Sequence, residues 1–469
     1  MADTATTATT AASATHILVF PYPAQGHMPA LLDLTHQLAL RGLKITVLIT
    51  PKNLPALSPL LSTHPTSIET LVLPLPPHPK VPLGVENLKD IGNSGNAPVT
   101  AALSKLEGEV IQWFRSHPSP PQAIISDFFL GCTQHWATQL NIPRIAFFSV
   151  SAFLTCIFTH LWQQSDKLNN SNNFEFPDLP SSPSFTHDQL PSIFRKFKKG
   201  DPDWEIVREG MCANSNSWGY VYNSFYALEG EYLDHIKREL GHGRVYSVGP
   251  LGLIGLSKRV SPGVDTRYDV LNWLDTCPDN SVLYVCFGSQ KLLTEPQIRA
   301  LALGLEQSKT RFIWVVKSVS SQQVPDGFEE WVSDRGMVLR GWAPQPEILN
   351  HKAAGGFMSH CGWNSLLESV IAGVMILAWP MEADQFQNAR QLVEYAGLAI
   401  RVCEGEHTVP DSNSLAGIIY ESISQDIPQK ARARAMREKT LEAIKDGGSS
   451  AVGLDELVKE LNQLGVPKT

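Results

Sequence analysis

The sequence predicts an α/β protein of two doubly wound parallel sheets that face each other across a cleft. Three observations lead to this prediction. The chain has 469 residues, which exceeds the size of a single hydrophobic core. Short apolar runs alternate with helical stretches, a pattern typical of parallel sheets covered by helices on both faces. A stretch rich in Gly, Pro and Ser, residues 247–265, divides these runs into two sets.

The first set opens with Ile17–Phe20, an apolar run that ends at Pro21. Pro29 suits the first turn of the helix that follows, and Gly42 suits the end of that helix. The later strands are short apolar runs, often rich in β-branched residues. We expect them at Lys44–Thr50, Ile68–Leu75, Ala123–Phe129, Arg144–Val150 and Tyr220–Phe225.

The second set repeats this alternation without an internal sequence repeat, and a helix over residues 295–308 follows its first strand. In open sheets of this kind a ligand binds at the carboxyl ends of the strands, so residues that follow these runs are candidates for a site. The strands are expected at Ser281–Ser289, Arg311–Lys317, Gly336–Trp342, Gly355–His360, Met375–Pro380 and Gly397–Val402.

The two sets divide the chain into domains joined by a linker. Two stretches rich in Pro, Ser and Asn, residues 76–97 and 169–203, are expected to form long surface loops. The predicted division is a disordered tail over residues 1–15, a first domain over 16–249, a linker over 250–266, a second domain over 267–450, and a C-terminal helix over 451–469 that packs back on the first domain.

The composition is typical of a globular enzyme, with 43% hydrophobic and 18% charged residues. The net charge of −8 argues against nucleic acid or an acidic membrane surface as a partner. Seven cysteines without a C-x-x-C pair favour free thiols in a reducing compartment. No apolar run reaches the ~18 residues that span a membrane, and no signal peptide is recognisable. These features predict a monomeric cytoplasmic protein.

The stretch GGFMSHCGWNSLLES (Gly355–Ser369) could serve as a metal site, a nucleophile or an anion site. His360 and Cys361 are adjacent and point in different directions, which disfavours a metal. No sequence feature marks a lowered pKa for Cys361. Glycines before a helix start favour an anion held by backbone N–H groups. A capping box at Ser365–Glu368 explains two of the polar residues without any ligand, and this stretch alone leaves the two interpretations equal.

The neighbouring residues favour one interpretation. WAPQPEILNHKAAGGFMSHCGWNSLLESVIAGVMILAWPMEADQ (Trp342–Gln385) resembles the 44-residue signature of plant UDP-dependent glycosyltransferases. The similarity extends over nearly the whole chain and includes the Q-G-H loop, the F-G-S turn and the W-P-x-x-x-D-Q ending. Met375 stands where similar proteins usually carry proline, which should loosen the turn into the next strand. The resemblance implies two Rossmann-like domains in the GT-B architecture.

The resemblance also implies a site for UDP-sugar in the second domain. A carboxylate beside an amide suits sugar hydroxyls, because one group only accepts hydrogen bonds and the other both donates and accepts them. The matching residues are Trp342 for the uracil face, Ala343 and Gln345 for the uracil edge, Ser289, His360, Asn364 and Ser365 for the diphosphate, Glu368 for the ribose, and Trp363, Asp384 and Gln385 for the hexose.

His27 and Asp127 each follow a strand of the first domain, so both can reach one site. Taken alone, a histidine near a helix start is more often structural, and an aspartate at a strand end is often a turn or cap residue. The resemblance implies that His27 is the general base and that Asp127 fixes its tautomer and stabilises the imidazolium. Four aromatic residues near these strand ends are candidates for an acceptor pocket: Phe128, Phe129, Phe148 and Phe153.

The resemblance therefore implies an inverting transfer of glucose from UDP-glucose to a hydroxyl of a small plant phenolic, a flavonoid or hydroxybenzoate. UDP-xylose, UDP-rhamnose and a non-phenolic acceptor are alternatives. No metal or other cofactor is expected, and Asp201-Pro-Asp203, which matches the D-x-D of metal-dependent enzymes, is interpreted as a solvated loop. Two other classes are a nucleotide-sugar binder without catalysis and a nicotinamide-dependent oxidoreductase, although no G-x-G-x-x-G follows a strand.

Overall fold

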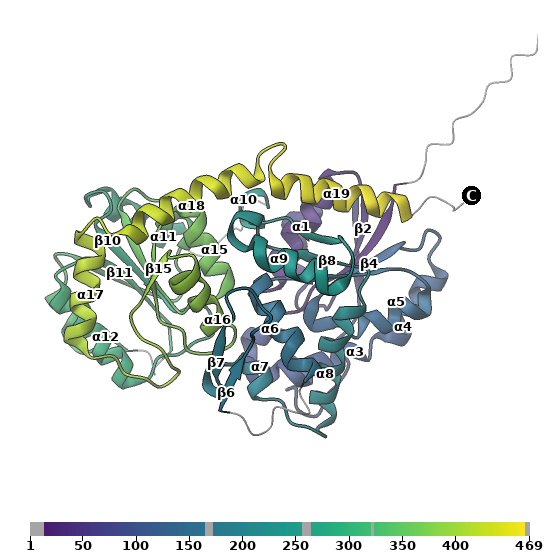
Figure 1. The fold of residues 1–469 in the computed structure, drawn as a ribbon, viewed down its shortest axis with the longest axis horizontal. Coiled ribbons are helices and arrows are strands. Elements are labelled where there is room, and N and C mark those ends of the chain that lie inside the picture. The colour runs from purple at the N-terminus through teal and green to yellow at the C-terminus, as the bar shows by residue number, and fades with distance from the viewer. Residues whose placement is uncertain (1–13, 165–171, 256–263, 320–322, 465–469) are drawn as a thin grey trace, which may run out of the picture.

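The computed structural model describes residues 14–164, 172–255, 264–319 and 323–464. Two lobes lie side by side, each built around one parallel sheet (Figure 1). No helix within these described ranges is long and apolar enough to cross a membrane. The predicted tail lies outside the described residues except for its last two, and so does the middle of the predicted linker, residues 256–263.

The first sheet has seven strands in the order β3-β2-β1-β4-β5-β8-β9, all parallel. The order reverses between β1 and β4, which makes this pair the switch point where open sheets bind ligands. The strands are β1 (His16–Phe20), β2 (Lys44–Ile49), β3 (Ile68–Val72), β4 (Ala123–Asp127), β5 (Arg144–Phe148), β8 (Gly219–Tyr222) and β9 (Val245–Ser247).

The second sheet has six parallel strands in the order β12-β11-β10-β13-β14-β15. Its order reverses between β10 and β13, so each lobe has one switch point. The strands are β10 (Val282–Cys286), β11 (Arg311–Val316), β12 (Gly336–Arg340), β13 (Ala354–Ser359), β14 (Ile376–Ala378) and β15 (Ala399–Arg401).

Helices cover both faces of each sheet (Figure 1). Those of the first lobe are α1 (Met28–Leu40), α2 (Ser58–Thr63), α3 (Asn96–Ser104), α4 (Glu107–Ser116), α5 (Thr133–Leu140), α6 (Ala152–Gln163), α7 (Ser192–Arg195), α8 (Pro202–Ala213), α9 (Tyr226–Leu240) and α10 (Leu251–Ile254). The rest are α11 (Val264–Asp275), α12 (Glu295–Ser308), α13 (Phe328–Trp331), α14 (Gln345–Leu349), α15 (Trp363–Ala372), α16 (Gln385–Arg390), α17 (Ser412–Ser424), α18 (Pro428–Ile444) and α19 (Ser449–Leu464).

The strands alternate their side chains between two cores because successive residues of a strand point to opposite faces. In β1, Ile17 and Val19 pack with α1 and α19, whereas Leu18 and Phe20 pack in a separate core on the other face. All four are nearly fully buried. Burial on both faces explains why these strands are continuous apolar runs in the sequence.

The last two helices connect the lobes. They cross the top of both sheets in Figure 1, where α18 lies over the second lobe and α19 over the first. Leu454, Leu457 and Leu461 of α19 belong to the core that contains β1 and α1. Arg41 at the end of α1 donates to Asp455 over 2.7 Å. Helix α19 therefore forms part of the hydrophobic core around β1 and α1.

The prediction of a long loop over residues 169–203 is wrong for most of the part that the structure describes, residues 172–203. It contains a hairpin of β6 (Asn173–Glu175) and β7 (Ser184–Thr186), the short helix α7 and the start of α8. Asp201 caps α8 by accepting from the backbone N–H groups of Asp203 and Trp204, and Asp203 is buried. The D-x-D sequence is therefore a helix start, because proline suits the first turn and aspartate the cap.

The turn before β14, where Met375 replaces the usual proline, is closed by hydrogen bonds. Gly373 N donates to Val370 O over 3.1 Å, and Val374 N donates to Ser369 O over 3.0 Å. The hydroxyl of Ser369 also donates to Val374 O. Met375 itself is buried in the core against α12 and α17. These bonds close the turn without the conformational restriction of a proline.

Candidate active site

His27 and Asp127 meet at the switch point of the first sheet. His27 is the residue before α1, and Asp127 is the last residue of the neighbouring strand β4. His27 Nδ1 lies 2.9 Å from Asp127 Oδ2. The Asp127 side chain is fully buried, and 18% of the His27 side chain is exposed. A carboxylate only accepts hydrogen bonds, so Nδ1 carries the proton and the lone pair of Nε2 is available as a base.

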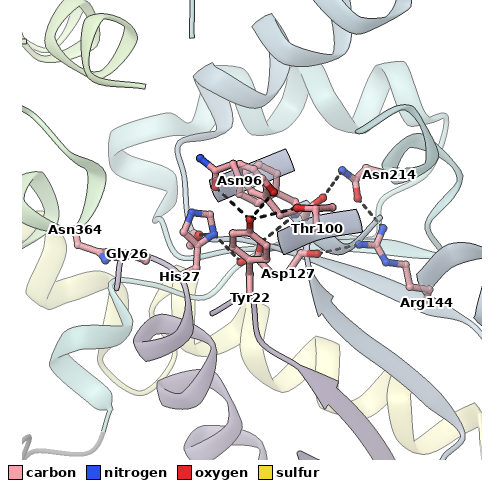
Figure 2. A network of polar contacts seen from close by, with 12 residues as sticks. Tyr22, Gly26, His27, Asn96, Thr100, Asp127, Arg144, Asn214 and Asn364 are labelled. Atoms are coloured by element: carbon pink, nitrogen blue, oxygen red, sulfur yellow. Dashed lines mark hydrogen bonds and ion pairs between the residues drawn. The ribbon is translucent and has the colours of Figure 1, made fainter. Parts of the chain in front are cut away.

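Neighbouring residues fix the Asp127 carboxylate. Its Oδ1 accepts from Phe129 N over 2.9 Å. Arg144 is fully buried on the side of Asp127 away from His27, and its Nη2 donates to the backbone oxygen of Asp127 over 3.3 Å (Figure 2). Burial lowers the pKa of Arg144 to about 10, so the guanidinium is charged at neutral pH. Asn214 bonds both Arg144 and the oxygen of Phe128, which fixes the turn after β4.

Ser149 is a contact of His27 that the sequence analysis missed. Its Oγ lies 3.0 Å from His27 Nδ1, and the side chain is buried just beyond the end of β5. Its position one strand further along the same sheet edge is the signal that could have identified it. Arg144 was missed as well, because a charged residue at the start of a buried strand gives no local indication of its partners.

Aromatic rings surround His27. Phe128 stacks on the imidazole with ring centroids 5.5 Å apart, and Phe129 meets it edge-on at 5.2 Å. Tyr22 stacks on Phe129 at 4.8 Å, and its hydroxyl is held by Asn96 and Thr100 (Figure 2). Phe129 is partly exposed beside His27, whereas Phe128 is 2% exposed and packs behind it in the core of the first lobe.

The other two predicted acceptor-pocket residues are core residues. Phe148 is 3% exposed and lies behind Phe128, with its ring stacked on Tyr222. Phe153 is fully buried against Tyr232, 4.8 Å between centroids. Phe148 and Phe153 are thus core residues like Phe128, but only the Phe128 ring also lies beside the His27 ring. The position of a phenylalanine after a strand does not indicate which ring ends beside His27.

The segment between β13 and α15 forms the second switch point. Gly362 is the N-cap of α15, so Ser365 lies at the third helical position and the predicted capping box is wrong. The first N–H groups of α15 are thus left for a ligand. Burial lowers the pKa of His360 to about 4, so its ring is neutral, and its buried Nδ1 has no hydrogen-bond partner among the described residues. Burial raises the pKa of Cys361 to about 12, which excludes a thiolate at neutral pH.

Two glycines allow this segment to close around His360. A Cβ at Gly288, in the turn after β10, would lie 2.6 Å from the imidazole. A Cβ at Gly362 would lie 2.7 Å from the same ring. Ser289 follows Gly288 and is exposed. The turn after β10 and the amino terminus of α15 therefore both approach the Nε2–Cε1 edge of the His360 ring.

Two side chains of α15 bond across to the first lobe. Asn364 Nδ2 donates to Gly26 O, next to His27, over 2.9 Å (Figure 2). Trp363 Nε1 donates to Asn223 O over 3.0 Å, and its ring is 3% exposed. The Trp363 side chain is therefore part of the interface between the lobes, and only its backbone remains available to a sugar.

The residues predicted for the nucleoside lie along α14 and α15. Trp342 is 40% exposed, as a stacking surface requires, and Ala343 is buried. Gln345 Nε2 donates to Glu368 Oε2 over 2.6 Å and to Ser365 Oγ over 3.2 Å. The structure thus brings Gln345, Ser365 and Glu368 together.

The residues predicted for the hexose follow β14. Asp384 Oδ2 accepts from Asn388 Nδ2 over 2.8 Å. Burial raises the pKa of Asp384, while Asn388 and the nearby His27 act in the opposite direction. Gln385 Oε1 accepts from Met381 N and Glu382 N, which leaves its amide group as a donor. Asp384 and His27 thus lie near each other, although they come from different lobes.

Comparison with known proteins identifies the family. A family model described as "UDP-glucoronosyl and UDP-glucosyl transferase" matches residues 262–426. UDP-glycosyltransferase 89A2 of Arabidopsis thaliana is 51% identical over 453 residues, 96% of this chain and 96% of that protein. The chain belongs to the plant UDP-glycosyltransferase family. The UDP-glycosyltransferase activity predicted from the sequence is thereby confirmed.

Two further relatives of this glycosyltransferase carry names that describe their substrates. The flavonol 3-O-glucosyltransferase UGT89B1 of Arabidopsis thaliana is 47% identical over 97% of this chain and 98% of that protein. The crystal structure of Arabidopsis thaliana UGT89C1 complexed with UDP-L-rhamnose has a TM-score of 0.80 at 40% identity, covering 96% of this chain and 100% of that chain. The same protein complexed with quercetin gives 0.79. The predicted GT-B fold is confirmed.

Proposed function

We propose that this glycosyltransferase moves glucose from UDP-glucose to a phenolic hydroxyl of a flavonol, with inversion at the anomeric carbon and without a metal. The observation that carries the proposal is the 2.9 Å contact between His27 and Asp127, next to the amino terminus of α15. We assign the acceptor to the first lobe, residues 16–249, and the UDP-sugar to the second, residues 267–450.

His27 acts as the general base in this proposal. A phenol of pKa ~10 facing a histidine of ~6.5 differs by ~3.5 units, or ~5 kcal/mol for complete prior deprotonation. Proton transfer to Nε2 during attack on the anomeric carbon avoids most of this cost. Asp127 stabilises the imidazolium that forms, because its carboxylate already bonds Nδ1. Attack opposite the leaving UDP turns an α-linked donor into a β-glucoside.

The donor residues act as the family signature implies. Trp342 stacks on uracil, the backbone of Ala343 and the side chain of Gln345 bind its edge, and Glu368 binds the ribose. Ser289, His360, Asn364 and Ser365 bind the diphosphate at the amino terminus of α15, which offers free N–H groups and a positive dipole end. The backbone of Trp363 and the side chains of Asp384 and Gln385 bind the hexose.

Glucose is the proposed sugar because Asp384 and Gln385 place a carboxylate beside an amide donor. The relative UGT89B1, named as a glucosyltransferase, supports this choice. Rhamnose is the second candidate, because the structure of the relative UGT89C1 contains UDP-L-rhamnose. UDP-xylose is the third donor to test.

A flavonol is the proposed acceptor because the partly exposed ring of Phe129, supported by the buried rings of Phe128 and Tyr22, lies beside His27 and suits a flat aromatic molecule. The relative bound to quercetin supports the same class. A hydroxybenzoate is the alternative phenolic acceptor. We also propose that the enzyme is a monomer in the cytoplasm, which gel filtration and localisation of a tagged chain would test.

The test is product formation from UDP-glucose, UDP-L-rhamnose and UDP-xylose with quercetin and a hydroxybenzoate, without added metal. Wild type and His27→Ala are compared, with His36→Ala as a matched control because the His36 ring contacts His64 rather than Asp127. We expect a β-glucoside of quercetin from wild type and His36→Ala, and a decrease of about 10²- to 10⁴-fold in His27→Ala. Undiminished turnover in His27→Ala would contradict the base assignment, and product from UDP-L-rhamnose alone would contradict the sugar.

A further inference from the structure

The diphosphate site needs a source of positive charge that the predicted residues do not supply. His360 is neutral because burial lowers its pKa to about 4. Asn364, Ser365 and Ser289 are uncharged side chains. A departing UDP gains negative charge as its bond to the sugar breaks, and preorganised donors and cations are what stabilise such charge. The helix dipole gives a partial charge.

Lys317 lies beside these residues. It follows β11, the strand next to β10, so its side chain is at the same sheet edge as the turn after β10. Its Nζ donates to the backbone oxygen of Ser289. After burial, the charge of Lys317 is the second cause that lowers the pKa of His360. The His360 ring lies against Gly288, the residue before Ser289. The ammonium group has two more N–H groups to donate.

The Lys317 side chain is partly buried, and its amino group forms no ion pair among the described residues. The carboxylate of Glu382 is near enough to favour its charge, but burial has the larger effect and lowers the pKa of Lys317 to about 8. Cys286 is the other titratable neighbour, and burial raises the pKa of its thiol. A half-buried cation without a salt bridge is stabilised when an anionic ligand arrives.

We propose that Lys317 is the cation that binds the diphosphate of the UDP-sugar and stabilises the departing UDP. This inference rests on the proposed function, in which the diphosphate lies at the amino terminus of α15. In the transfer step the acceptor oxygen forms a bond to the anomeric carbon, while the bond from that carbon to the β-phosphate oxygen breaks and its electron pair stays on the phosphate oxygen. His27 takes the proton of the acceptor hydroxyl. Lys317 keeps its protons throughout and acts by charge and hydrogen bonding.

The proposal predicts how UDP affinity depends on pH. The free enzyme carries the charge on Lys317 below pH ~8 and loses it above that value. Bound diphosphate holds the proton more tightly, so affinity is full below pH ~8 and decreases as pH rises further. The last phosphate proton of UDP leaves near pH ~6, outside this window. Uridine has no phosphate and does not sense the charge on Lys317. The uracil N–H titrates near the top of this range in UDP and uridine alike, so the ratio of the two affinities reports the charge on Lys317.

The experiment is calorimetric titration of the full-length enzyme with UDP and with uridine between pH 7 and 9.5. Wild type is compared with Lys317→Met and Lys317→Arg. Lys291→Met is the matched control, because Lys291 lines the same small cavity but already pairs with Glu406 at 3.2 Å. We expect Lys317→Met to weaken UDP by about 10- to 100-fold at pH 7, the effect of losing a charged hydrogen bond, with uridine binding unchanged.

Two further results are expected. Lys317→Arg should keep tight UDP binding without the decrease above pH 8, since a guanidinium does not titrate there. Lys291→Met should bind UDP like wild type. Equal affinity of Lys317→Met and wild type for UDP would overturn the inference. An equal decrease in the affinities for UDP and for uridine would overturn it as well, because that result would indicate that the substitution has displaced the turn at Ser289. Failure of wild type to bind UDP would instead contradict the proposed donor site.

Discussion

Replacement of Asp127 by asparagine tests the catalytic pair with little change in shape. The amide occupies the same volume and keeps an oxygen for the Phe129 N–H group, which now lies 2.9 Å from Oδ1. It loses the charge that stabilises the imidazolium of His27. Its NH₂ group also favours the tautomer in which Nδ1 accepts and Nε2 is already protonated. Base catalysis should therefore fail although the fold is intact.

The expected loss follows from the geometry of this pair. The contact is 2.9 Å long and the carboxylate is fully buried, so the bond is charge-assisted and screened little by water. A hydrogen bond to a charged group contributes about 2–3 kcal/mol, which corresponds to a decrease of ~30- to 150-fold in kcat. The tautomer change adds to this decrease, so the range is a lower bound.

The assay measures initial rates with UDP-glucose and quercetin, together with UDP affinity and the melting temperature. Asp203→Asn is the matched control, because Asp203 forms a similar 2.9 Å contact with His78 in the same lobe but away from the site. We expect Asp127→Asn to lose turnover with UDP affinity unchanged, and Asp203→Asn to keep turnover. The reasoning would be refuted if Asp127→Asn retained a third of the wild-type kcat, or if both variants lost activity equally.

Three further predictions concern other predicted site residues. Trp342→Ala should weaken UDP and uridine equally, by ~10-fold, because it removes base stacking, and calorimetry would contradict this if only UDP were affected. Phe153→Ala should lower the free energy of unfolding by about 3–5 kcal/mol in urea titrations, whereas Phe129→Ala should mainly raise the KM for quercetin; the reverse pattern would refute the pocket assignment. The pKa of His360 is about 4 in the folded state and ~6.5 in the unfolded state, so the unfolded state binds more protons between pH 4 and 6.5. The free energy of unfolding therefore falls as pH decreases through this range, and His360→Gln should remove up to ~3 kcal/mol of that fall. Identical pH profiles of unfolding for wild type and His360→Gln would contradict the prediction.

The sequence predicted the features that depend on short-range pattern. Strands buried on both faces are apolar runs, so the positions and approximate bounds of most strands of the two sheets followed directly. The short edge strand β9 was not predicted. The pair His27 and Asp127, 100 positions apart, was predicted from the family resemblance together with the position of both residues at strand ends of one sheet. The family signature indicated the donor residues, and the structure brings Gln345, Ser365 and Glu368 into hydrogen-bond contact.

The features that sequence reasoning missed depend on contacts between distant segments. The Trp363 indole bonds Asn223, 140 positions away, and this contact directs it into the interface rather than toward a sugar. Phe153 and Phe129 look alike in the sequence, and only the packing of Tyr232 and Tyr22 separates a core ring from a pocket ring. The hairpin β6–β7 was missed because each strand has three residues, too few for a periodicity.

The packing of α19 against β1 and α1 has a consequence for how the chain is made. Arg41 and Asp455 are 414 positions apart, and the leucines of α19 belong to the same core as Ile17 and Val19. Domains usually fold in the order in which they leave the ribosome. Here an apolar strip of the first lobe stays uncovered until residues 449–464 have been synthesised. A chain that stops before Ser449 exposes that strip, so truncated products of this protein should be recognised by chaperones and proteases even when both sheets are present.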